Sequence, residues 1–299
     1  MAQAELSPAQ TRATADVAPV GDKGRRYRRT IAYGFLVFYA LLMFVPFLWM
    51  IITSFKTQPD SVQMTWIPNP ISLDGWERAF TELNPNIVQL FFNSAIVAGA
   101  VTISNVVLGA MAGYAFARLR FRGREVLFIL VLATMMIPDQ LRLVPVYQIM
   151  FRLGLTAGGP MQFVSVTLVM GIAAVSVFLM RQYFLSIPRD LEEAAKIDGA
   201  GFFTTFWRVM LPLATPAIAA VAILQFQGAW NGFFWPLVLL TDRDNWTLPL
   251  GLSQFQDAYT TYWPSLMAVS LLSTIPIIIL FVFFQRYFVE GIAAAGVKG

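Results

Sequence analysis

Long uninterrupted apolar runs constrain this chain more than any other feature of its sequence. About 20 apolar residues in a helix cross the ~30 Å hydrocarbon core of a bilayer. Only helices and closed barrels satisfy their backbone hydrogen bonds there, and continuous rather than alternating runs argue against a barrel. The runs cover residues 31–55, 90–117, 126–144, 161–184, 209–240 and 265–288. We therefore predict an all-α, polytopic integral membrane protein with six transmembrane helices.

The six runs also suggest how the chain is divided. We expect residues 30–288 to form one six-span domain, between a disordered basic tail over 1–29 and a short tail over 289–299. The third run is interrupted by Pro138, Asp139 and Gln140, which leaves residues 141–154 as an amphipathic segment at the membrane surface.

The positions of the basic residues predict the orientation in the membrane. Loops that stay in the cytoplasm carry an excess of Lys and Arg. If the N-terminus is cytoplasmic, sixteen of the 21 Lys and Arg residues fall in inner segments and five in outer ones. We therefore expect both termini, the basic loop over 118–124 and the loop over 186–212 to be cytoplasmic.

The composition excludes several kinds of chemistry. The chain has no Cys and no His, so thiol chemistry, disulfides and imidazole ligands are impossible. It also lacks a P-loop and a nucleophile elbow, the devices that cradle phosphates and activate a serine. We predict a non-enzymatic protein with no cofactor or metal of its own. The net charge of +4 reflects membrane orientation rather than nucleic-acid binding.

The loop over 186–212 is unlike the apolar runs around it. Pro188 can occupy the first turn of a helix, where its missing N–H costs nothing, and acids follow in that turn. Gly199 can end the helix in the left-handed conformation, which gives about three turns and ~16 Å. Leu191, Ala194, Ala195 and Asp198 share one face by their spacing, a shallow surface that another protein's backbone could approach. The alternative is a plain connector lying against the bilayer.

The spacing within this loop resembles the EAA loop of binding-protein-dependent ABC importer permeases. Their pattern is EAA-x3-G-x9-I-x-L-P, and here only the Ile is replaced, by Val209. In that family the loop forms a coupling helix that docks on an ATP-hydrolysing subunit. The resemblance assigns this coupling role to Glu192, Glu193, Ala194, Ala195, Lys196, Asp198, Gly199, Leu211 and Pro212.

Further stretches resemble the maltose-type (MalG-like) carbohydrate permeases, which have the type I importer fold. They include "GYAFARLRFRGRE", "WNGFFWPLVLLTD" and "QRYFVEGIAAAGVKG". The resemblance implies a bacterial inner-membrane subunit that imports a sugar, a disaccharide or oligosaccharide. Its partners would be a second homologous permease, two ATP-binding subunits that use ATP and Mg, and an extracytoplasmic solute-binding protein.

Polar and aromatic residues in the fifth run are candidates for the solute pathway. Gln227, Trp230, Asn231 and Phe234 share a helical face by their spacing, and aromatic rings beside amides suit a sugar. The alternative is that the amides bond to a neighbouring helix. In the second run, Gly109 and the glycine four residues later predict close helix packing rather than transport chemistry.

Three other functions remain open. Within the same transporter class, the solute could be glycerol phosphate or another polar molecule. A stand-alone secondary carrier would need intramembrane acids or histidines, and none of the six runs has an acid near its centre. A membrane scaffold would move no solute. The basic loop over 118–124 is most simply an orientation anchor, with contact to the ATPase as the alternative.

Overall fold

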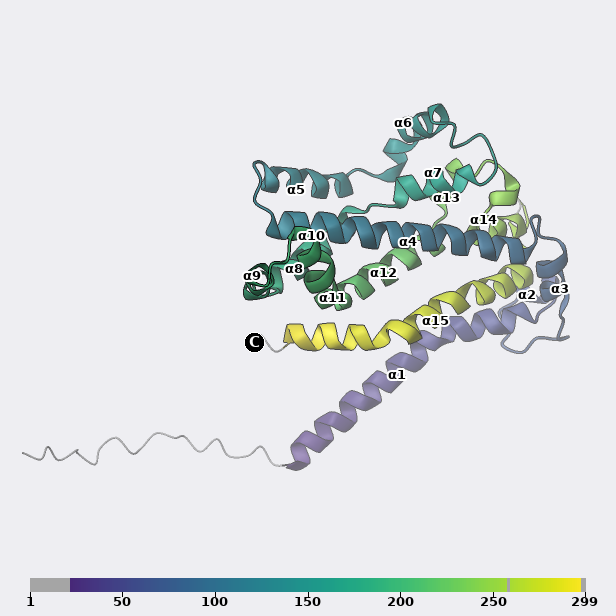
Figure 1. Cartoon of the computed structure of the whole chain (residues 1–299). Coiled ribbons are helices and arrows are strands. Elements are labelled where there is room, and N and C mark those ends of the chain that lie inside the picture. The colour runs from purple at the N-terminus through teal and green to yellow at the C-terminus, as the bar shows by residue number, and fades with distance from the viewer. Residues whose placement is uncertain (1–21, 257–258, 297–299) are drawn as a thin grey trace, which may run out of the picture. The chain divides into compact units, whose positions relative to one another are not determined.

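The computed structural model describes residues 22–256 and 259–296. Its contacts divide the chain into two compact units, Met1–Trp49 and Met50–Gly299, each of which is described by itself. The helices are α1 (Asp22–Ser54), α2 (Gln58–Ser61), α3 (Asp74–Thr81), α4 (Ile87–Arg118), α5 (Arg124–Ala133), α6 (Asp139–Arg152), α7 (Met161–Met170), α8 (Ala174–Ser186), α9 (Asp190–Ile197), α10 (Phe202–Thr205), α11 (Leu211–Leu213), α12 (Thr215–Trp230), α13 (Phe234–Leu239), α14 (Leu248–Leu252) and α15 (Trp263–Gly296). Figure 1 shows these elements.

Three helices are long and apolar enough to cross a membrane unaided: Arg26–Ser54 in α1, Ile87–Arg118 in α4 and Trp263–Gln285 in α15. Three further pairs of helices pass the same test together but are bent where they meet. The chain thus has three such spans, or up to six if each bent pair crosses the membrane. All six overlap the apolar runs of the sequence, although the helix pair of the fifth span begins and ends earlier than the run over 209–240.

The tails are more helical than we expected. α1 begins at Asp22, so residues 22–29 of the predicted disordered tail are helical. α15 continues to Gly296, through most of the predicted C-terminal tail. Residues 1–21 and 297–299 lie outside the described residues. Both helices thus extend beyond their apolar runs.

The third span is broken before the predicted end at residue 144. Its helix stops at Met136, and the chain turns by 104° into α6. Pro138 explains the break, because a residue before proline is pushed out of the helical conformation. Ile137 accordingly has an extended backbone, with φ −89° and ψ 111°. Residues 139–152 therefore form a separate helix.

The fourth and fifth spans are also broken. The break in the fourth is contrary to the continuous run that we predicted, whereas Pro212 and Pro216 lie at the bend in the fifth. α7 and α8 meet at a 52° bend around Gly171, and the helices before and after Ala214 meet at 76°. The fifth run is interrupted again at Asn231, where α12 ends before α13 restarts at Phe234.

α4 is the central helix of the unit Met50–Gly299 and packs along α8 and α12 (Figure 1). A β-carbon at Gly113 would lie 2.6 Å from the β-carbon of Met180, and one at Gly109 would lie 3.0 Å from that of Ser176. The predicted close packing at these glycines is therefore confirmed, with α8 as the partner helix.

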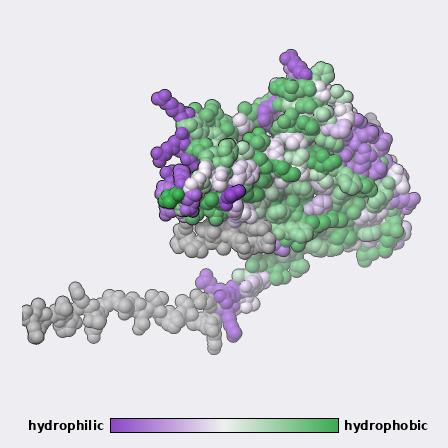
Figure 2. Space-filling model, in the orientation of Figure 1, coloured by the Kyte–Doolittle hydropathy of each residue, from purple (hydrophilic) through white to green (hydrophobic). Residues whose placement is uncertain are grey.

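The surface of this unit separates into polar ends and an apolar middle. In Figure 2, hydrophilic residues gather over the end with α9 and over the end with α3 and α14, with hydrophobic residues between them. The intervening surface of α4 and α5 exposes large apolar side chains, including Phe92, Ile103 and Ile129. This distribution suits a protein whose middle faces lipid.

Candidate coupling helix and helix-break cavity

α9 forms where the sequence places acids before a glycine. Asp190, Glu192 and Glu193 lie in its first turn, where they complement the positive end of the helix dipole, and Lys196 lies in the last. Gly199 follows with φ +81°, the left-handed conformation that glycine adopts readily. The predicted end is thus confirmed. The start is later than predicted, at Asp190 rather than Pro188, so the helix is about 12 Å long.

α9 is fixed to the last turns of α4 through Glu192. The Tyr114 hydroxyl donates a hydrogen bond to Glu192 Oε1 over 2.9 Å. Arg118 Nε lies 3.7 Å from Glu192 Oε2, and the two side chains are only 4% and 13% exposed. Arg118 also donates a hydrogen bond to the Ile187 carbonyl, just before the helix. Because both charges are shielded from water, removal of either side chain alone would leave an uncompensated buried charge between α4 and α9.

The remaining residues of the motif's first half divide between an inner and an outer side. Ala195 is buried, and its exposure is 8%. The exposed residues of this half are Glu193, Ala194, Lys196, Asp198 and Gly199. The single face that we predicted for Leu191, Ala194, Ala195 and Asp198 is therefore divided, because Ala195 packs inward while the others are exposed.

The second half of the motif lies at the bend that leads into α12. One π-helical turn over Phe206–Met210 precedes α11, in which Pro212 stands in the first turn. Leu211 packs against a buried cluster that includes Tyr114 and Phe206. Tyr114 therefore contacts both halves of the loop: its hydroxyl binds Glu192, and its ring lies 5.0 Å from the ring of Phe206, centroid to centroid.

The predicted solute face in the fifth span is not continuous. Trp230 is a core residue, 2% exposed, whose indole N–H donates to the Ser273 carbonyl over 3.0 Å. Gln227 and Asn231 are exposed and Phe234 is half-buried. The helix ends between Trp230 and Phe234, so the spacing that assumed one continuous helix does not bring these four residues onto one face.

A cavity of about 480 Å³ lies where the third and fourth spans are broken. Its lining combines backbone from both breaks with a few polar and aromatic side chains. Asp139 and Arg142 line it and form an ion pair with each other. The guanidinium carbon of Arg142 lies 5.9 Å from the ring centroid of Trp235, and Gln225 of α12 completes the polar lining. Non-helical backbone inside a membrane is tolerated where it lines such a cavity.

Asn105 of α4 forms hydrogen bonds with the backbone groups that lose their helical partners at the break in the fourth span. Its side chain is fully buried. The amide nitrogen donates to the Met170 carbonyl over 2.8 Å, and the oxygen accepts from the Ala173 N–H over 2.7 Å. The Ser176 hydroxyl also donates to that oxygen, over 3.0 Å. One side chain thus serves both sides of the break.

Sequence reasoning missed Arg142 and Trp235 as lining residues, and it did not include Gln225 in the predicted solute face. A signal was available for the first, because the Pro138 interruption predicted a break in the third span. The residue after such a break lines a cavity only if a neighbouring helix is also broken, and nothing in the sequence around Gly171 marks that second break.

Comparison with known proteins agrees with this architecture. Residues 105–293 match the family described as binding-protein-dependent transport system inner membrane component. The chain is 37% identical to the arabinooligosaccharides transport system permease protein AraQ of Halalkalibacterium halodurans, over 90% of this chain and 95% of that protein. It is 33% identical to the trehalose/maltose transport system permease protein MalG of Thermococcus litoralis, over 87% and 93%.

A solved structure shares the fold. It is a chain from the crystal structure of a bacterial ABC transporter involved in the import of the acidic polysaccharide alginate, with a TM-score of 0.74 and 24% identity. The match covers 91% of this chain and all of that chain. From the family match over most of the sequence and the similarity to permeases along nearly its whole length, we conclude that this chain belongs to the inner-membrane permease components of binding-protein-dependent transport systems.

Proposed function

We propose that this chain is the permease subunit of an ATP-driven importer for a disaccharide or oligosaccharide in a bacterial cytoplasmic membrane. In this proposal α9 transmits the movement of a separate subunit, which binds ATP and Mg and hydrolyses the nucleotide. The chain itself carries no catalytic group, cofactor or metal. The chain changes between two arrangements of its helices. The ATP-hydrolysing subunit can shift the equilibrium between them only by binding the two arrangements with different affinities.

The single observation that carries this proposal is the structure of α9. The helix is held to α4 by the shielded Glu192 carboxylate, while Glu193 and Lys196 are exposed beside it. A helix that is fixed on one side and presents charges on the other can carry a force from a partner to the spans. A connector that merely lay on the bilayer would need no buried ion pair to its neighbour.

The orientation rests on the basic residues. Four arginines lie at the end of α4 that carries α9, namely Arg118, Arg120, Arg122 and Arg124. An excess of Lys and Arg marks the cytoplasmic side, so we assign α9 and both termini to the cytoplasm. The opposite end of α4, with α3 and α14, then faces outward.

The family and its relatives support the partners and the solute. A binding-protein-dependent system includes an extracytoplasmic solute-binding protein, which would deliver solute to the outer end. We further propose a second homologous permease beside this chain and two ATP-binding subunits beneath them. The two similar permeases are named for oligosaccharide and disaccharide transport, which favours a sugar here.

The helix-break cavity supports a neutral solute. Asp139 neutralises Arg142, so the cavity offers no excess positive charge to a phosphate-bearing solute such as glycerol phosphate. Trp235 supplies an aromatic face and Gln225 an amide, a pairing that suits a sugar ring with hydroxyls.

Of the residues first proposed for the pathway, two keep that role in the proposal. Gln227 and Asn231 are exposed and remain available to solute or to the second permease. Trp230 and Phe234 are outside the residues that line the helix-break cavity and belong to, or pack against, the core cluster that includes Leu239, so we assign them a supporting part.

Substitution of Glu193 by Lys tests the coupling role. The complex should be purified with its partners, reconstituted in vesicles and assayed for ATP hydrolysis and sugar uptake together. We expect Glu193→Lys and Gly199→Asp to abolish ATP-driven uptake while the protein remains inserted. The matched control is Glu77→Lys on α3, an acid that is also exposed and lies at the other end of α4. Normal uptake by the Glu193→Lys complex would refute the assignment of α9.

A further inference from the structure

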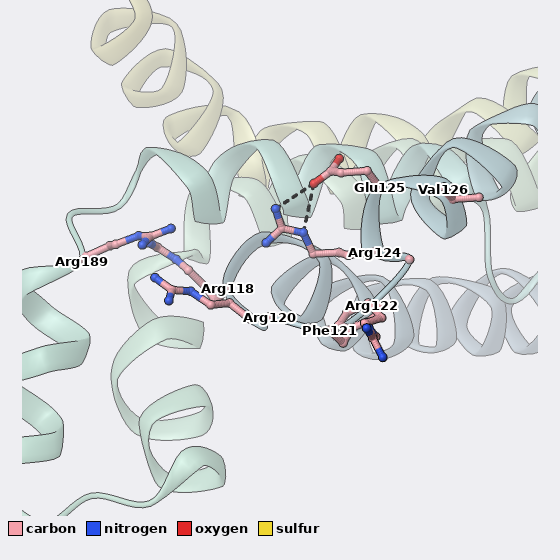
Figure 3. A pocket seen from close by; sticks show the side chains of 9 residues that line it. Arg118, Arg120, Phe121, Arg122, Arg124, Glu125, Val126 and Arg189 are labelled. Carbon is pink, nitrogen blue, oxygen red and sulfur yellow. Dashed lines mark hydrogen bonds and ion pairs between the residues drawn. The ribbon is translucent and has the colours of Figure 1, made fainter.

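A basic depression of about 730 Å³ lies between the end of α4 and the start of α9. It is lined by five arginines, Arg118, Arg120, Arg122, Arg124 and Arg189. Glu125 is the only acid among the described residues that line it. Figure 3 shows the head groups of Arg118, Arg120 and Arg189 gathered together, with Arg122 pointing away from them.

Most of this positive charge is not neutralised by the residues that the structure describes. Glu125 is engaged by Arg124 at 2.8 Å and by Arg181 at 3.0 Å, and Arg118 is engaged by Glu192. Arg120 and Arg189 are exposed, and neither has an ion pair or side-chain hydrogen bond with another described residue. Two converging cations without counter-charges favour an anionic ligand.

The position of the depression shows what kind of anion fits. Arg118 is the last residue of one apolar spanning helix, and Arg124 is the first residue of the next. The depression therefore lies at the depth where the bilayer meets water. Its lining also includes Phe121 and Val126, which are 42% and 63% exposed. A ligand that satisfies both parts of the site has an anionic head and apolar chains.

We propose that this depression binds the headgroup of an anionic phospholipid, with Arg120 and Arg189 on its phosphate and the acyl chains along Val126 and α5. Basic pockets beside spanning helices on the cytoplasmic side suit such headgroups. The inference rests on the proposed function only for assigning this end of α4 to the cytoplasmic leaflet. Because Arg189 immediately precedes α9, a bound phosphate would link the coupling helix to the turn between α4 and α5.

Lipid titration of the purified full-length chain tests this proposal. The chain in detergent is titrated with dioleoyl phosphatidylglycerol, and bound lipid is counted by native mass spectrometry, with dioleoyl phosphatidylcholine as the reference lipid. Each basic residue near an anionic headgroup strengthens binding about fivefold. We therefore expect Arg120→Gln/Arg189→Gln to weaken phosphatidylglycerol binding about 25-fold and to leave phosphatidylcholine binding unchanged.

The matched control is Arg152→Gln/Arg208→Gln, which removes two exposed arginines outside the depression and should change the affinity less than twofold. Equal weakening by both pairs, or no weakening by the first, would overturn the proposal. Displacement of the lipid by millimolar inorganic phosphate would show that a free anion suffices. If the Arg120→Gln/Arg189→Gln chain binds phosphatidylglycerol normally but no longer co-purifies with the ATP-hydrolysing partner, the depression is a protein-docking site instead. Because the lipid titration itself needs no partner and no sugar, its outcome is independent of the transport test.

Discussion

Replacement of Asn105 by Leu should show how much the fourth-span break depends on one side chain. Leu keeps nearly the same shape but removes every polar atom. Three hydrogen bonds from α4 to the broken fourth span are lost, namely those with Met170, Ala173 and Ser176. Such bonds average about 0.6 kcal/mol in membranes, whereas a buried group left unpaired costs about 1–3 kcal/mol. We therefore expect the free energy of unfolding to fall by about 2–4 kcal/mol.

Thermal unfolding of the detergent-purified chain, followed by tryptophan fluorescence, measures this loss. At about 2 °C per kcal/mol for a chain of this size, the midpoint should fall by about 4–8 °C. The control is Thr102→Val on the same helix, whose hydroxyl donates only to the Ala98 carbonyl of its own helix and should cost less than about 0.5 kcal/mol. If both variants unfold at the same temperature, the break does not depend on Asn105.

Two further pairs of substitutions, each a test and its control, probe packing and transport. Gly113→Ala places a β-carbon 2.6 Å from that of Met180 and should lower the thermal midpoint, with a cost in stability of about 1–3 kcal/mol. The control is Gly99→Ala on the same helix. Its β-carbon would meet nothing within 4 Å, so this variant should be neutral or stabilising in the same assay. Gln225→Leu should raise the KM for sugar uptake about tenfold, as expected for the loss of one hydrogen bond worth roughly 1.4 kcal/mol. Gln227→Leu, outside the cavity lining, should change the KM less; the reverse order would place the solute on the originally predicted face.

Sequence patterns predicted the features of this chain that depend on local chemistry. Hydropathy located all six apolar runs, because the bilayer thickness sets their length wherever they pack. The end of α9 at Gly199 followed from the conformational freedom of glycine at a left-handed position. The close approach at Gly113 followed from the absence of a side chain there.

Features that depend on distant residues were not predictable from local sequence. The α7–α8 break contains no proline, and its open backbone groups are satisfied by Asn105 from another helix. The burial of Trp230 depends on the Ser273 carbonyl of α15, which no spacing within the fifth run reveals. The break in the third span was different, because Pro138 marked it in advance.

The two neighbouring acids of α9 have separate tasks. Glu192 faces its own chain and Glu193 faces away from it, although a sequence comparison would treat them as one acidic pair. A defect at the first position would begin as a loss of internal attachment and would precede any encounter with another subunit. A defect at the second would leave the folded chain intact and appear only once the transporter is assembled. Mutational data on this loop should therefore be sorted by position before the phenotypes are compared.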